Sequence, residues 1–236
     1  MSADNKKEQV GTYASPPCLA HEIDPAYFDP LAVDPGQAHD VARWRKAKRQ
    51  ELRALRKTLS VDEHAAASAR IAAHLEAVLQ DRFDGAGGLI LSMYWPIKGE
   101  PNLRDLMARL HSTGVTIALP LVETKAAPLV FRHWTPETKM VRGDWNIPVP
   151  PRDARQVTPD IALAPLVGWD GEGYRLGYGG GYFDRTLAAL ETAPFKIGIG
   201  FTAARQPTIY PQPHDIAMDV IVTEAGARDA RHTRQK

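Results

Sequence analysis

The sequence predicts an α/β fold in which a largely parallel sheet forms the middle of three layers. The first observation is a series of short apolar runs with the length and composition of buried strands. They lie at residues 88–94, 115–119, 129–133, 161–167, 195–201 and 220–222. The second observation is that helical patterns separate several of these runs. Strands that alternate with helices pair in parallel and are covered on both faces.

Two helices are predicted before the first strand. Residues 38–58 are rich in Arg, Lys, Ala and Leu, which are good helix formers. Ser60 followed by Glu63 is a capping-box signature and opens the second helix. The apolar face of that helix consists of Ile71, Leu75, Val78 and Leu79.

Two more helices follow later in the chain. Asn102 is the expected N-cap of one, and Gly114 is placed to end it. Its predicted buried face is Leu103, Leu106, Met107 and Leu110. The other begins within the glycine-rich segment near residue 181, with Phe183, Leu187 and Leu190 on one face.

The ends of the chain differ from its middle. Residues 1–36 carry repeated prolines and are expected to form an irregular or partly disordered extension, with residues 37–236 as a single domain. The tail from Ala225 is polar and is expected to fray. Cys18 is the only cysteine, so no internal disulfide can form and a reducing cytoplasm is expected.

Composition excludes several classes of partner. The formal net charge is +1, without the basic excess that nucleic-acid binding requires. The apolar runs are too short to cross a membrane. Neither nucleic acid nor a membrane is therefore an expected partner.

The most informative stretch is residues 175–185, Arg-Leu-Gly-Tyr-Gly-Gly-Gly-Tyr-Phe-Asp-Arg, called here the glycine segment. Glycine-rich backbone approaches ligands closely, and successive amide groups can form an anion site. A following helix N-terminus would favour bound phosphate. The segment lacks the Gly-Lys-Ser/Thr of Walker A and does not fit Gly-x-Gly-x-x-Gly. The simple alternative is a structural turn, which the surrounding aromatic and charged residues disfavour.

Residues 168–185 closely resemble the signature of the 5-formyltetrahydrofolate cyclo-ligase family, also called methenyltetrahydrofolate synthetase. Other pieces similar to the family occur in order at 49–53, 97–100, 145–150 and 214–224. The resemblance implies a three-layer fold shared with ribose-phosphate isomerases and CoA transferases. It also implies ATP- and magnesium-dependent cyclisation of 5-formyltetrahydrofolate to 5,10-methenyltetrahydrofolate, with release of ADP and phosphate, by a monomer.

The resemblance implies three sets of site residues. Those expected to bind ATP are Arg49, Arg53, Arg175, Leu176, Gly177, Tyr178, Gly179, Gly180, Gly181, Tyr182 and Phe183. Those expected to bind the folate are Trp95, Glu100, Trp145, Tyr178, Gly179, Gly180, Gly181 and Tyr182. Asp184 and Asp215 match the magnesium positions, and magnesium commonly takes one or two carboxylates together with water.

Each of these assignments has a plainer alternative. Arg49 and Arg53 share a helix face, but they stand among other basic residues, including Arg45 and Arg56, and could belong to a solvated basic face. Glu100 and Asp184 could be residues of a helix first turn. Trp95 and Trp145 could be ordinary core aromatics.

Two other functions remain open on sequence alone. A sugar-phosphate isomerase or a CoA-transferase-like enzyme could use the same architecture, because fold does not determine function. A folate-binding protein without turnover is the other alternative. The glycine segment and the two aspartates favour the ligase.

Overall fold

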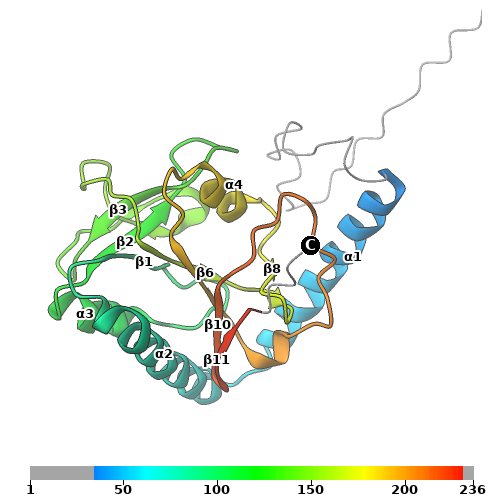
Figure 1. Cartoon of the computed structure of the whole chain (residues 1–236), viewed down its shortest axis with the longest axis horizontal. Helices are drawn as coiled ribbons and strands as arrows, with labels where there is room; N and C mark the ends of the chain where they lie inside the picture. The colour runs from blue at the N-terminus through cyan, green and yellow to red at the C-terminus, as the bar shows by residue number, and fades with distance from the viewer. Residues whose placement is uncertain (1–34, 231–236) are drawn as a thin grey trace, which may run out of the picture.

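A computed structural model describes residues 35–230 of the 236-residue chain (Figure 1). Most of the predicted extension, including Cys18, lies outside these residues, as do residues 231–236. The first described helix, α1, spans Pro35–Arg56. Pro35 was expected to lie in the irregular extension, but it opens the helix. Proline suits a first helical position because the amide it lacks would have no intrahelical partner there.

The second helix, α2 (Val61–Phe83), begins as the sequence predicts. The Glu63 amide donates to Ser60 Oγ at 3.2 Å, and the Ser60 amide donates to Glu63 Oε2 at 2.8 Å. This reciprocal pair is the predicted capping box. A short 3₁₀ turn, η3 (Asp84–Ala86), follows the helix.

The helix α3 (Arg104–Ser112) begins one residue later than predicted. Its N-cap is Leu103, and Asn102 Oδ1 instead accepts a 3.3 Å hydrogen bond from the Arg104 amide. Asparagine can form such local bonds without capping, so the sequence alone did not separate the two roles. Gly114, with φ of +90°, lies just beyond the helix as expected.

Seven strands form the main sheet in the order β11-β10-β9-β6-β1-β2-β3. Their bounds are β1 (Ile90–Ser92), β2 (Thr116–Leu121), β3 (Val130–Trp134), β6 (Ile161–Pro165), β9 (Phe195–Ile199), β10 (Val220–Thr223) and β11 (Gly226–Asp229). The five central strands are mutually parallel, while β3 and β11 run antiparallel at the two edges. The prediction of a largely parallel α/β sheet is confirmed.

The strand β11 corrects the expectation that the chain frays from Ala225. It pairs with β10 from Thr223↔Gly226 to Val220↔Asp229. Most of its residues are exposed. An edge strand can remain polar because only one side of it is paired, so no apolar run marks it in the sequence.

Two apolar cores cover opposite faces of the sheet. On one face, α2 and α3 contribute Ile71, Leu75 and Met107 to the larger core. On the other face, Leu52 of α1 and Leu187 of α4 (Tyr182–Ala189) pack with Ala162 and Ala164 of β6. Helices on both faces make the three layers that the sequence predicts (Figure 1).

Short two-stranded elements complete the described fold. β4 (Val141–Arg142) pairs with β5 (Pro148–Val149) around the turn η4 (Asp144–Asn146). β7 (Gly168–Trp169) pairs with β8 (Arg175–Leu176), and η5 (Thr202–Ala204) follows β9. The β7–β8 hairpin lies between β6 and the glycines of the glycine segment, and β8 forms the first two residues of that segment. No helix within residues 35–230 is long and apolar enough to cross a membrane.

Candidate active site

The candidate site lies where the order of the strands reverses. From β1 the sheet continues to β2 on one side and to β6 on the other, and all three strands are parallel. Ligands of open α/β sheets bind at such a point, beyond the carboxyl ends of the strands. The segment after β1 carries Glu100, and the segment after β6 leads through the hairpin to the glycine segment.

The glycine segment turns sharply into α4. Gly179 has φ of +105° and Gly181 has φ of +64°, values that side chains disfavour. Gly181 is the N-cap of α4. Gly177 is different, because its φ is not positive and an added Cβ would meet nothing within 4 Å. The positive φ values therefore explain why glycine occupies positions 179 and 181. They do not explain Gly177, where there is open space for a side chain.

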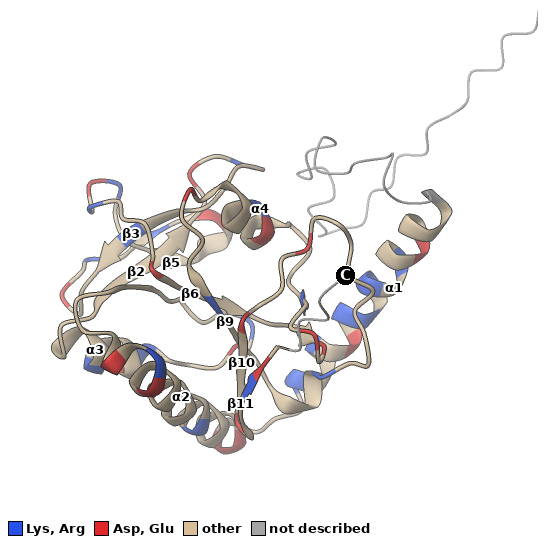
Figure 2. Ribbon diagram, viewed as in Figure 1, with Lys and Arg blue, Asp and Glu red and all other residues tan. Residues whose placement is uncertain are grey.

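Basic side chains of α1 meet this segment, and Figure 2 marks the Lys and Arg positions of the helix in blue. Arg49 Nε donates a 2.8 Å hydrogen bond to the Gly177 carbonyl. The Arg53 guanidinium carbon lies 5.7 Å from the centre of the Tyr178 ring, and Lys98 Nζ lies 5.2 Å from the same ring. The structure thus brings Arg49 and Arg53 to the glycine segment.

Two arginines of α1 are buried, although the sequence pattern allows them to belong to a solvated basic face. Arg45 is 8% exposed and Arg56 is 6% exposed. Positions 45, 49, 52 and 56 follow helical spacing, and Leu52 of this row belongs to a core. This spacing could have indicated from the sequence that Arg45 and Arg56 are buried. Charged residues at the neighbouring positions instead made the whole helix resemble an exposed one.

Both candidate magnesium ligands form ion pairs with arginine. Asp184 Oδ1 lies 2.9 Å from Arg175 Nη2 and accepts a 3.0 Å hydrogen bond from the Ile216 amide. Asp215 Oδ2 lies 2.5 Å from Arg45 Nη2 and accepts a 2.7 Å bond from the Gln212 amide. The Ile216 amide belongs to the residue after Asp215, so the two carboxylates lie in one region.

Glu100 is buried, at 3% exposure, although it is acidic. The Ile97 amide donates to its Oε2 at 2.9 Å, and the Tyr178 hydroxyl donates to its carboxylate. Burial raises the pKa of Glu100 to about 7, while these hydrogen bonds and the charge of Arg56 act in the opposite direction. A buried carboxyl group whose pKa is raised to about 7, in the segment that follows β1, is a candidate functional group.

Three residues of the glycine segment have side chains that are buried or packed against other parts of the protein. Arg175 is 6% exposed and donates to the Ile216 carbonyl at 2.8 Å. Leu176 is fully buried in the core beside α1, and Phe183 packs against the same core. Contacts from Leu176 to a nucleotide would therefore have to come from its main chain.

The predicted aromatic residues are divided between two places. The Trp145 ring, 49% exposed, lies 5.7 Å edge-on from the Tyr182 ring, and Trp145 has φ of +52°. Trp95 is packed against the core of α2 and α3, with the Arg104 guanidinium 5.4 Å from its ring. These contacts join Trp145 to the glycine segment and Trp95 to α3.

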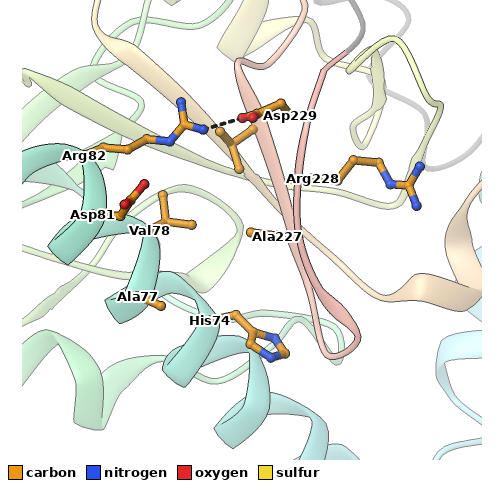
Figure 3. A pocket seen from close by; sticks show the side chains of 9 residues that line it. His74, Ala77, Val78, Asp81, Arg82, Ala227, Arg228 and Asp229 are labelled. Carbon is orange, nitrogen blue, oxygen red and sulfur yellow. Dashed lines mark hydrogen bonds and ion pairs between the residues drawn. The ribbon is translucent and has the colours of Figure 1, made fainter.

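A groove lies away from this site, on the side of the sheet edge that α2 covers. It has a volume of about 280 Å³ and lies between α2 and β11 (Figure 3). An exposed ion pair between Arg82 and Asp229, at 2.6 Å, crosses its rim, and Arg228 points away from α2. It runs along β11 from Ala227 to Asp229, at the edge of the sheet that β11 forms.

The fold and the site define an α/β protein in which a glycine-rich turn meets arginines of α1 at the reversal of the strand order. Residues 41–224 match the 5-formyltetrahydrofolate cyclo-ligase family, and the chain belongs to that family. It is thus an enzyme of folate one-carbon metabolism, and its family uses ATP.

Individual relatives agree with this membership. The chain is 26% identical to a 5-formyltetrahydrofolate cyclo-ligase of Haemophilus influenzae over 186 residues, covering 75% of this chain and 97% of the relative. It is 33% identical to that of Escherichia coli over 102 residues, covering 41% and 56%. The 5,10-methenyltetrahydrofolate synthetase of Aquifex aeolicus superposes with a TM-score of 0.66 at 26% identity, covering 81% of this chain and 95% of that one.

Proposed function

We propose that the chain catalyses the ATP- and magnesium-dependent cyclisation of 5-formyltetrahydrofolate to 5,10-methenyltetrahydrofolate, releasing ADP and phosphate. The observation that carries the proposal is the convergence on the glycine segment. Arg49 from α1 contacts its backbone, and Glu100 from the segment after β1 contacts its Tyr178. Cations suited to phosphates and a carboxylate suited to pterin N–H groups thus meet at one loop.

The reaction requires ATP and 5-formyltetrahydrofolate to be bound at the same time. The formyl oxygen is a poor leaving group, so the γ-phosphoryl group of ATP is first transferred to it. The neighbouring folate nitrogen then attacks the formyl carbon, the ring closes and phosphate leaves. Phosphoryl transfer depends on positioning and on neutralising charge. In this proposal Arg49, Arg53, Arg175 and the amides of residues 177–181 contribute those effects.

Asp184 and Asp215 fit a magnesium ion that arrives with ATP. Among the described residues, no group of three or more His, Cys, Asp and Glu side chains could form a protein cage for a metal. Magnesium does not need one, because one or two carboxylates with phosphate oxygens and water suffice. The two contacts of Asp184 described above both use Oδ1. Magnesium would supply further neutralisation of phosphate charge, and the two aspartates would hold it.

The pterin would lie near Glu100, with Tyr178, Tyr182 and Trp145 beside it. The exposed Trp145 ring provides a flat apolar surface, and the Tyr182 ring meets it edge-on. Trp95 is the weakest of the proposed folate contacts, because it packs with α3. It would reach the ligand only at the margin of the site.

A direct assay tests the proposal. Purified full-length protein is mixed with 5-formyltetrahydrofolate, ATP and MgCl₂, and the absorbance of methenyltetrahydrofolate is followed together with ADP. We expect equal amounts of both products, and no reaction with a non-hydrolysable ATP analogue or with excess EDTA. Folate binding without ADP formation would favour the non-catalytic alternative. Turnover of a sugar phosphate or an acyl-CoA instead would favour the other enzyme classes.

A further inference from the structure

Arg56, the last residue of α1, contacts segments that follow three neighbouring strands of the sheet. Its Nη2 donates to the Leu166 carbonyl after β6, at 2.5 Å. Its guanidinium carbon lies 5.7 Å from the Phe201 ring after β9. Its Cδ lies 3.3 Å from where a Cβ on Gly99, after β1, would be. One side chain therefore joins segments that follow β1, β6 and β9.

The same guanidinium also reaches the candidate folate site. Nη1 donates to the Tyr178 hydroxyl at 3.4 Å, and that hydroxyl donates to Glu100. The groups that face Glu100 are Arg56 of α1, Tyr178 of the glycine segment, and Tyr94 and Lys98 of its own segment. From α2, His64 Nε2 contacts the carbonyl of the adjacent Gly99 at 3.0 Å.

We propose that Arg56 is a positioning residue of the folate side of the site. It holds the Tyr178 hydroxyl and the turn at residues 97–100 so that the Glu100 carboxylate keeps its place and its negative charge. Arg56 itself does not touch the reacting atoms. The inference rests on the proposed function, because it assigns Arg56 a part in folate binding through Glu100.

A purely structural role would have different consequences. A cation at the end of α1 also favours the helix C-terminus, and its bond to the Leu166 carbonyl ties the helix to the sheet. Loss of those effects would lower stability and weaken both substrates together. Loss of a folate-positioning contact would act on 5-formyltetrahydrofolate and on the ionisation of Glu100, and would leave ATP largely unaffected.

Three variants separate these roles. Arg56→Gln removes the charge, Arg56→Lys keeps the charge but loses the planar fork, and Lys57→Gln is an exposed neighbouring control. KM for each substrate, kcat and unfolding midpoints are measured from pH 5.5 to 9. For Arg56→Gln we expect KM for 5-formyltetrahydrofolate to rise about tenfold or more and KM for ATP to change less than about twofold.

The pH profile is the second readout. Removing a nearby positive charge makes a carboxylate easier to protonate. The acidic limb of kcat/KM for 5-formyltetrahydrofolate, which reports the free enzyme, should therefore move to higher pH in Arg56→Gln and less in Arg56→Lys. Equal increases in both KM values, or an unmoved acidic limb, would overturn the inference.

A second measurement remains decisive if Arg56→Gln fails to fold. Arg56→Lys, Tyr178→Phe and their combination form a double-mutant cycle on KM for 5-formyltetrahydrofolate. We expect strong non-additivity, and additive effects would overturn the inference. A wild-type protein without turnover would overturn the proposed function and this inference together, whereas an active wild type with additive variants overturns the inference alone.

Discussion

Arg45 and Asp215 are 170 positions apart in the chain and form a nearly buried ion pair, with side-chain exposures of 9% and 8%. Arg45 also donates to the carbonyls of Ile209, at 3.0 Å, and Tyr210, at 2.9 Å. The pair attaches the segment carrying one proposed magnesium ligand to α1. The geometry of that ligand therefore depends on a helix near the start of the domain.

Arg45→Met should destabilise the protein strongly. Removal of one partner leaves the Asp215 carboxylate buried without its counter-ion, and such losses cost about 3–5 kcal/mol. Urea unfolding measures the change in free energy. Arg43→Met is the matched control, because its ion pair with Asp40 is exposed and such pairs contribute only about 0–1 kcal/mol. Similar losses in the two variants would contradict a structural role for the buried pair.

Asp184→Asn should abolish the increase in thermal stability that bound magnesium-ATP gives the protein. The amide keeps the size of the side chain but loses the charge that a cation needs. We expect turnover to fall by about 100-fold or more, as for loss of a group that stabilises transition-state charge. Thermal shifts with magnesium-ATP provide a readout independent of turnover. Asp229→Asn, in the groove of Figure 3, is the control, and retained turnover in Asp184→Asn at saturating ATP would count against the metal assignment.

Glu100 should make the protein less stable as the pH rises. Its pKa is raised from 4.5 to about 7 in the folded state, so the folded protein binds more protons than the unfolded chain between these values. Its contribution to stability is full below pH 4.5 and is lost as the pH rises through about 7, by up to about 3 kcal/mol. The free energy of unfolding of wild type and Glu100→Gln, measured from pH 4 to pH 9, should differ most in slope over this interval.

A parallel slope in the two proteins over that interval would show that Glu100 does not titrate as described. The same variant tests the folate assignment. Glu100→Gln should raise KM for 5-formyltetrahydrofolate more than KM for ATP, since the glutamine offers a weaker acceptor to pterin N–H groups. A defect confined to ATP would contradict that assignment.

Gly179→Ala should lower the stability of the protein, whereas Gly177→Ala should weaken ATP binding without lowering stability. Gly179 has φ of +105°, so alanine there is strained and should cost about 1–2 kcal/mol of stability. Gly177 has room for a methyl group, so its alanine variant should be as stable as wild type within about 0.5 kcal/mol. If Gly177 matters because ATP approaches its backbone, Gly177→Ala should still bind ATP more weakly by calorimetry. Unchanged ATP affinity would remove Gly177 from the proposed ATP contacts.

Local signals in the sequence determined most of the fold. Apolar runs predicted the buried strands, and the Ser60–Glu63 pair predicted the start of α2, because burial and capping depend on residues close together in the chain. The edge strand β11 was not predicted from the sequence. Most of its residues are exposed, so they form no apolar run.

The sequence by itself also identified the glycine segment and its family resemblance, since that motif is contiguous. Only the tertiary structure decided which cations and carboxylates meet there. Arg45 and Arg56 look like their solvated neighbours in the sequence, yet each is buried against a partner more than 100 residues away. The helical spacing of positions 45, 49, 52 and 56 marks a buried face of α1. The partners of Arg45 and Arg56 depend on how α1 lies across the ends of distant strands, which that spacing does not encode.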